Sequence, residues 1–200
     1  MPALRARTLL EAHLYVTLTA SHDDPGPADR PERDFDAHTT LTEGPEEWTV
    51  HFDGRALGLP LEIDVLVPYL TEFEARQDRL RFGAGRSELI DAGQWRLLGA
   101  SYARRALRED LRFAADPTDP ERFKAVVLGW EFARDATAEA AKFLPPGAGE
   151  VPAEGFWTES GTAMRRQAPE RFTRESLESD IAGYQETLDD FIVTHTSRNL

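Results

Sequence analysis

Two histidines and two aspartates in the first half of the chain have the types and spacing that metal chemistry requires. Asp36 and His38 are separated by one residue, and so are His51 and Asp53. Residues two apart in a β-strand share a face, and a hairpin brings such faces together. Two imidazoles and two carboxylates are an acceptable donor set for zinc or another divalent ion. The four residues are a candidate metal site, but the simpler interpretation of a solvated sheet face is favoured.

Other patterns of catalytic residues are missing from the sequence. The chain has no cysteine, so it offers no thiol nucleophile, disulfide or thiolate metal ligand. It contains no Gly-x-Ser-x-Gly elbow and no His-Glu-x-x-His helix. Its acidic residues are too evenly scattered to nominate a general acid–base pair. We therefore expect no catalytic residue and no cofactor, and the prediction leans away from an enzyme.

Three runs with a period of two must position the candidate metal residues. Apolar and polar side chains alternate over residues 34–41, 48–53 and 61–65, which is typical of strands with one buried and one wet face. Gly44-Pro45 indicates a turn, and Asp53-Gly54 is a strong hairpin signal. The runs predict a three-stranded antiparallel meander.

Four or five helices are expected around this meander. The apolar spacing of residues 4–18 predicts an N-terminal helix. Asp91 with Gln94 forms a capping box, and Asp119-Pro120 is a helix start. A short helix at 157–166 and a last one capped by Thr173 complete a helical C-terminal half. The predicted fold is α+β, in a single domain over 1–200 with an acidic meander region at 20–68 and a helical region at 91–200.

The charge of the chain is strongly negative and unevenly distributed. Of the net −13, residues 20–80 contribute −10, with 15 Asp and Glu against five Arg. Such a surface disfavours nucleic acid and anionic lipid and favours a basic partner protein, although acidity also serves solubility alone. No apolar run approaches the roughly 20 residues that span a bilayer. Without a signal peptide, the expected location is the cytoplasm.

Three sets of residues in the helical half allow two interpretations each. Arginines recur every fourth residue, either as an anion site or as an exposed face that pairs with the acidic half. Five aromatic residues line a ligand pocket or simply fill the core. Apolar residues in the last helix alternate spacings of four and three, which permits a homodimer. The sets are Arg104, Arg108 and Arg112; Trp95, Tyr102, Trp130, Trp157 and Tyr184; and Leu177, Ile181, Tyr184, Leu188 and Phe191.

Five sequence motifs are spread along most of the chain: EAHLY at 11–15, FG at 82–83, SELIDAGQW at 87–95, KFLPPGA at 142–148 and FWT at 156–158. In residues and in order they resemble a family of uncharacterised actinobacterial proteins of similar length. The resemblance implies no established activity. Family members tend to carry paired cysteines in the region that corresponds to 21–58, a spacing that suggests a small zinc ribbon. This chain has none of them, so the resemblance transfers no metal ligand and implies a meander held by packing alone.

These observations favour a non-catalytic binding protein. One concrete form is an immunity or antitoxin-like protein whose acidic first half covers a basic partner surface. The alternative is a small-molecule-binding protein or metal-dependent enzyme. That protein would use either the His and Asp face of the meander or an aromatic pocket between the helices.

Overall fold

The computed structural model describes residues 3–20, 35–56 and 59–196. The chain divides into two compact units, unit 1 at Met1–Leu89 and unit 2 at Ile90–Leu200. Unit 1 combines a sheet with short helices, and unit 2 is helical. The α+β class and the helical C-terminal half are therefore confirmed. That the whole chain acts as one domain stays a prediction.

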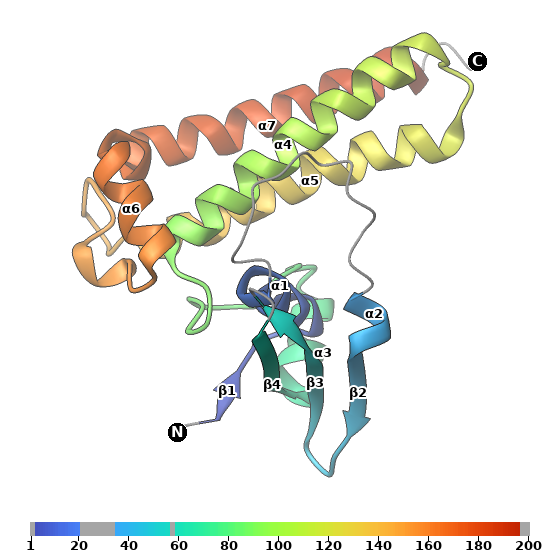
Figure 1. Cartoon of the computed structure of the whole chain (residues 1–200). Coiled ribbons are helices and arrows are strands. Elements are labelled where there is room, and N and C mark those ends of the chain that lie inside the picture. Colours follow the sequence, from blue (N-terminus) through green and yellow to red (C-terminus); the bar gives the residue numbers. More distant parts are fainter. Residues whose placement is uncertain (1–2, 21–34, 57–58, 197–200) are drawn as a thin grey trace. The chain divides into compact units, whose positions relative to one another are not determined.

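The sheet of unit 1 has four strands in the order β1-β4-β3-β2 (Figure 1). β2 (Thr39–Glu43), β3 (Glu47–Ala56) and β4 (Leu59–Pro68) form the antiparallel meander. β1 (Leu4–Arg5) pairs with β4 in parallel, so the sheet is mixed and has one strand more than the predicted antiparallel meander. A strand of two residues carries no periodicity by which the sequence alone can reveal it.

The N-terminal helix is shorter than predicted. α1 covers Leu9–Ala20, because the residues before it are drawn into the sheet, where Leu4 pairs with Val65. Thr8 caps the helix start, and its hydroxyl accepts the Glu11 N–H at 3.2 Å. α1 packs on β3 and β4 and covers their buried side chains. The meander is thus held by apolar packing beneath one helix.

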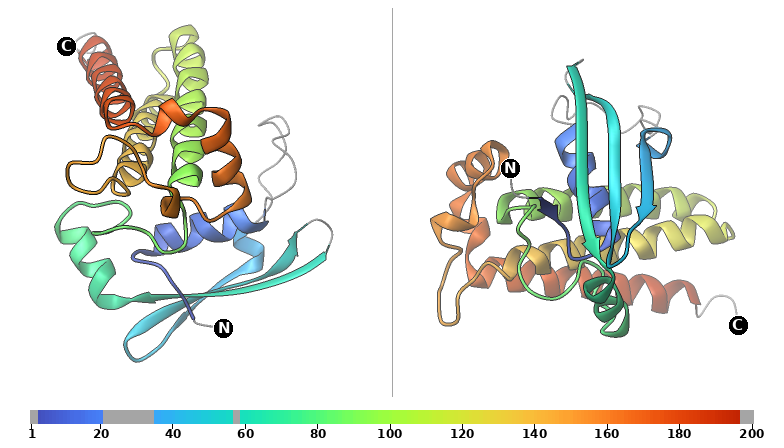
Figure 2. Two further views of the ribbon diagram at one scale, coloured as in Figure 1. Left: turned by 90° about the vertical axis from the view of Figure 1, so that its left-hand side faces the viewer. Right: turned by 90° about the horizontal axis from the view of Figure 1, so that it is seen from below.

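Two details of the predicted meander are wrong. Residues Phe35–His38 form a short helix, α2, and the strand begins only at Thr39. Where the ladder would continue, Nδ1 of His38 lies 3.0 Å from the carbonyl oxygen of Asp53. Asp53 and Gly54 lie within β3, whose pairing with β4 extends to Ala56 and Leu59. A side chain at Gly54 would collide with the ring of Phe52, so this glycine serves packing and not a turn. Figure 2 shows β3 and β4 as a long pair with the shorter β2 at its edge.

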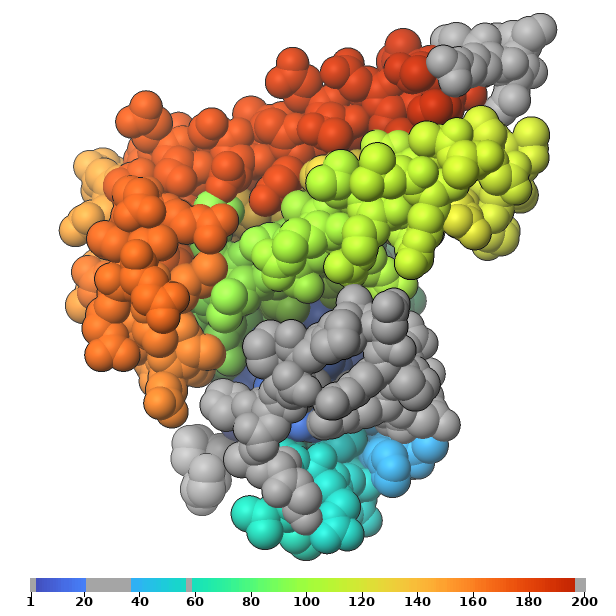
Figure 3. All heavy atoms as spheres, turned by 45° about the horizontal axis from the view of Figure 1, so that its top comes forward, coloured from blue at the N-terminus to red at the C-terminus, as the bar shows by residue number. Residues whose placement is uncertain are grey.

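Unit 2 is built on three long helices, α4 (Ala92–Ala115), α5 (Pro120–Ala141) and α7 (Arg174–Thr196). They enclose an apolar core formed by Ala106, Phe113, Val126, Trp130, Ala133, Leu188 and Phe191. α6 (Glu159–Gln167) and two short 3₁₀ helices, η1 (Ala153–Gly155) and η2 (Pro169–Phe172), lie between α5 and α7 in sequence. Figure 3 shows α4 and α7 side by side on one face of this unit.

The predicted starts of the long helices are confirmed. Asp91 forms the capping box with Gln94, and the Asp119 side chain accepts two main-chain N–H groups at the start of α5. The Thr173 hydroxyl accepts the Ser176 N–H at 3.2 Å. The described residues nevertheless contain more helices than the four or five expected. The additional ones are α2 and α3 (Tyr69–Gln77), both in unit 1. Across the described ranges, every helix is too short or too polar to cross a membrane.

Candidate functional site

The outer face of the β3–β4 hairpin carries two of the four predicted metal residues, His51 and Asp53. Val50 and Phe52 point to the core under α1, so the alternation of β3 places His51 and Asp53 on the opposite face. The same alternation in β4 places Glu62 and Asp64 there. In the register of the pair, His51 lies directly opposite Asp64, and Asp53 lies directly opposite Glu62. We call Asp53, Glu62 and Asp64 the acidic face.

His51 is the one basic residue among the four side chains of these two cross-strand pairs. Its Nδ1 lies 2.7 Å from Oδ1 of Asp64. This hydrogen bond raises the pKa of His51 above 6.5, and the negative charges of Asp64, Glu62 and Asp53 act in the same direction against partial desolvation. The hydrogen bond to Asp64 also engages Nδ1, one of the two ring nitrogens that a metal ion could use.

The predicted metal residues are only partly brought together. His38 turns its ring to the main-chain oxygen of Asp53, while His51 pairs with Asp64, which the sequence did not nominate. Asp36 lies in α2, and its side chain lies outside the described part. Among the described residues, no three His, Asp or Glu side chains are grouped to hold a metal ion. Glu62 and Asp64 are spaced like His51 and Asp53, and this spacing is the sequence pattern that could have identified them as residues of the same face. A metal at the predicted residues stays a prediction.

The Asp91 carboxylate joins two of the sequence motifs. Asp91 is 0% exposed, and its Oδ1 accepts the Gln94 N–H at 2.8 Å. Its Oδ2 accepts three further hydrogen bonds, from the Trp157 N–H at 3.1 Å, the Thr158 N–H at 2.8 Å and the Thr158 hydroxyl at 2.6 Å. The carboxylate thereby ties the start of α4 to the segment before α6. Because it is enclosed and fully bonded, its role is to join segments and not to transfer protons.

The same junction requires two glycines. A Cβ on Gly93 would collide with the backbone of Gly161, and a Cβ on Gly161 would collide with the carboxylate of Asp91. α4 and α6 therefore approach more closely than any side chain permits. The third motif is adjacent, since the rings of Phe143 and Trp157 are 5.9 Å apart. Three motifs of the chain thus converge on one structural junction.

Two buried carboxylates in unit 1 also serve the fold. Glu11 accepts the main-chain N–H of Arg7 at 2.7 Å and pairs with the Arg7 guanidinium. Glu72 accepts the main-chain N–H of Leu9 at 2.8 Å and pairs with Arg76. These N–H groups belong to the first turn of α1 and the residues before it, where the helix supplies no acceptor. Both carboxylates therefore stabilise the start of α1.

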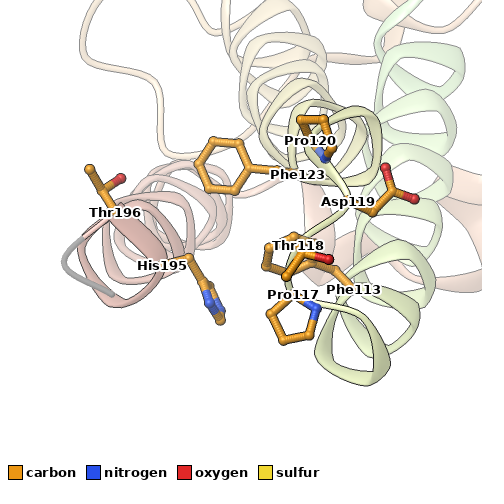
Figure 4. A pocket seen from close by; sticks show the side chains of 8 residues that line it. All are labelled: Phe113, Pro117, Thr118, Asp119, Pro120, Phe123, His195 and Thr196. Atoms are coloured by element: carbon orange, nitrogen blue, oxygen red, sulfur yellow. The ribbon is translucent and has the colours of Figure 1, made fainter. Parts of the chain in front are cut away.

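A pocket of about 310 Å³ opens at one end of the three-helix core. Its lining comes from the α4–α5 connection and the end of α7: Phe113, Pro117, Thr118, Asp119, Pro120, Phe123, His195 and Thr196. The rings of Phe113 and His195 meet edge to face at 4.9 Å. Figure 4 shows that the Asp119 carboxylate points away from His195. None of the five aromatic residues proposed as a pocket lines it, and Trp95, Trp130 and Tyr184 are core or partly buried residues.

The last helix uses its apolar seam within unit 2. Leu177, Leu188 and Phe191 are buried, and Tyr184 packs against the core. Ile181 is half-buried. This packing leaves little of the seam for a second copy of the chain. Of the arginines, Arg104 and Arg108 are exposed, and Arg112 pairs with Glu109 at 2.8 Å.

Comparisons with known proteins give no relative from which a function can be transferred. No protein-family model matches the chain, and neither a curated protein nor a solved structure matches it. The resemblance to actinobacterial proteins therefore stays an expectation. The function has to be argued from the geometry of the described residues.

Proposed function

We propose that this protein is a non-catalytic protein-binding module whose acidic face covers a basic surface on a partner protein. An immunity protein or an antitoxin would act in this way. The observation that carries the proposal is the cross-strand pair of Asp53 and Glu62, two exposed carboxylates placed directly opposite each other. We further propose that the protein acts in the cytoplasm, where a chain without cysteine needs no oxidative folding.

The Asp53–Glu62 pair is unfavourable for the isolated sheet. Like charges directly opposite each other across a strand pair repel, and a neutral pair such as the neighbouring Thr42 and Thr49 avoids this cost. Local choices that oppose the stability of a fold are typical of functional surfaces. A lysine or arginine of a partner would replace the repulsion by attraction. Asp64 extends the negative surface along β4.

The surroundings of the acidic face suit a partner protein better than a small ligand. The face is an open strand surface, whereas small-molecule sites are concave and mostly apolar. Charges on such a surface chiefly accelerate association and select the partner. The buried carboxylates Glu11, Glu72 and Asp91 are engaged by main-chain donors, and this favours a binding role over acid–base catalysis.

Neutralising the acidic face tests the proposal. The tagged protein, its Asp53→Asn/Glu62→Gln/Asp64→Asn variant and a control variant are used to capture partners from host extract. Capture is repeated in about 0.1 M and about 1 M salt, where the Debye length falls from about 10 Å to about 3 Å. The control, Glu175→Gln/Glu186→Gln/Asp190→Asn, removes three exposed acidic residues of α7 and the same charge.

One stoichiometric protein should be retained by the wild type and the control, and lost from the acidic-face variant and in high salt. With the purified partner, its association rate constant should fall about tenfold or more in the acidic-face variant. A partner that binds the acidic-face variant as rapidly as the wild type would refute the proposal. Stoichiometric metal in the purified protein, with a melting temperature lowered by chelator, would favour the metal-dependent alternative.

A further inference from the structure

Arg96 is a buried arginine with most of its hydrogen-bonding capacity unused. Its side chain is 1% exposed and projects from α4. Nη2 donates to the carboxylate of Asp180 on α7. Nε and Nη1 are enclosed, and no acceptor lies within reach among the described residues. A guanidinium has five N–H donors and cannot lose its charge, so this group stays cationic with unsatisfied donors.

Unsatisfied donors of this kind call for an occupant. Nearly all buried polar groups in folded proteins bond to protein, to ordered water or to an ion. Charged donors bind anionic oxygens at shorter distances and more strongly than neutral acceptors. The geometry of a guanidinium suits a carboxylate or a phosphate group, which presents two or more oxygens. Arg96 therefore has the chemistry of an anion-binding group.

The charges around Arg96 point in the same direction. Tyr184 follows Asp180 by about one turn of α7, and burial is the first cause that raises the pKa of its hydroxyl. The Asp180 charge adds to this effect, whereas Arg96, Arg171 and Arg104 oppose it. One carboxylate and three guanidinium groups thus act on the same point. Guanidinium groups thus outnumber carboxylates among the charges that act on Tyr184.

We propose that Arg96 anchors a binding site for a small oxyanion, a phosphate or a carboxylate group, between α4 and α7 of unit 2. The oxygens accept hydrogen bonds from Nε and Nη1, while Asp180 holds Nη2. Arg171 and Arg104 attract the anion at longer range. Asp180 is the entry point, because its side chain is 38% exposed while Arg96 is enclosed. The site belongs to unit 2 and does not depend on the acidic face.

The Nε–H resonance of Arg96 gives a direct test. The ¹⁵N-labelled protein is titrated separately with inorganic phosphate and with acetate, and sodium chloride keeps the ionic strength constant. A saturable shift of the Arg96 Nε–H signal, with a rise in melting temperature at millimolar anion, is expected. The two titrations show whether a phosphate or a carboxylate group is preferred, and either preference supports the site.

Variants separate anion binding from general salt effects. Arg96→Lys keeps the charge but loses the paired donors, so the anion-dependent rise in melting temperature should disappear. Arg108→Met, which removes an exposed arginine from the same helix, should retain it. Asp180→Asn removes the competing carboxylate and should bind the anion several-fold more tightly. It also keeps the test valid if the Arg96 variant does not fold.

Two results would overturn the proposal. In the first, the Arg96 Nε–H signal is unchanged by both anions in the wild type and in Asp180→Asn, which would mean that the donors hold only water. In the second, the melting temperature of Arg96→Lys rises with anion as much as that of the wild type, which would place the effect elsewhere.

Discussion

Removing the Asp91 carboxylate should destabilise unit 2 far more than loss of an ordinary helix cap. Asp91→Ala removes the N-cap of α4, which costs about 1 kcal/mol. It also leaves the main-chain N–H groups of Trp157 and Thr158 without their acceptor, 66 and 67 residues away in sequence. Each unsatisfied donor costs about 1–3 kcal/mol. The free energy of unfolding should therefore fall by about 3–7 kcal/mol, a large part of the stability of a typical domain.

Urea unfolding followed by tryptophan fluorescence measures this loss. Trp95, Trp130 and Trp157 lie in unit 2, so the signal mainly reports on that unit. With a slope of about 2 kcal/mol per molar urea, the midpoint should fall by about 1.5–3.5 M. Asp119→Ala is the matched control, because Asp119 caps α5 and its carboxylate reaches no residue beyond Arg122 in the described hydrogen bonds. Equal losses in the two variants would refute the assignment of Asp91 as a junction between α4 and the segment before α6.

Two further predictions concern the glycine junction and the His51 pair. Gly161→Ala should lower the free energy of unfolding by about 1–3 kcal/mol, because the added methyl group overpacks against Asp91. Gly183→Ala, where a Cβ meets open space in α7, should raise the free energy of unfolding by up to about 1 kcal/mol. Urea midpoints distinguish the two signs, and shifts in the same direction would contradict the close approach of α4 and α6. By NMR titration the pKa of His51 should exceed 6.5, and Asp64→Asn should lower it. Because the raised pKa of His51 belongs to the folded state, the stabilisation by the His51–Asp64 pair is fully present below pH 6.5 and is lost as the pH rises through the folded pKa. A His51 pKa that Asp64→Asn leaves unchanged would contradict the pairing.

The strand register explains which parts of the candidate site were predictable. The alternation of residues 48–53 and 61–65 was enough to place His51 and Asp53 on the wet face of the sheet. It was not enough to choose their partners, because register depends on contacts between strands. The sequence pattern suggested Asp36 and His38 as partners, but the structure pairs His51 with Asp64 instead. The Asp53-Gly54 turn failed for a related reason, since a local turn signal was overridden by ten-residue pairing and by the Phe52 ring over Gly54.

Arg96 shows a different limit of the sequence. In the α4 sequence it is one of several arginines, and the more regular series at Arg104, Arg108 and Arg112 attracts attention first. Only the tertiary structure separates Arg96 from Arg108, by burying the former and leaving the latter exposed. Burial depends on which helices pack on either side, and the spacing of residues in one helix does not contain that information.

What the sequence determined by itself was local. It specified the capping box of Asp91 and Gln94, the start of α5 at Asp119-Pro120, the wet and buried faces of β3 and β4, and the acidity of the first half. The tertiary structure decided everything that joins distant segments: the parallel strand β1, the partner of His51, the second role of Asp91 and the burial of Arg96. The physical reason is that caps and periodicity act within a few residues. Register, close glycine contacts and burial arise only when segments far apart in the chain meet.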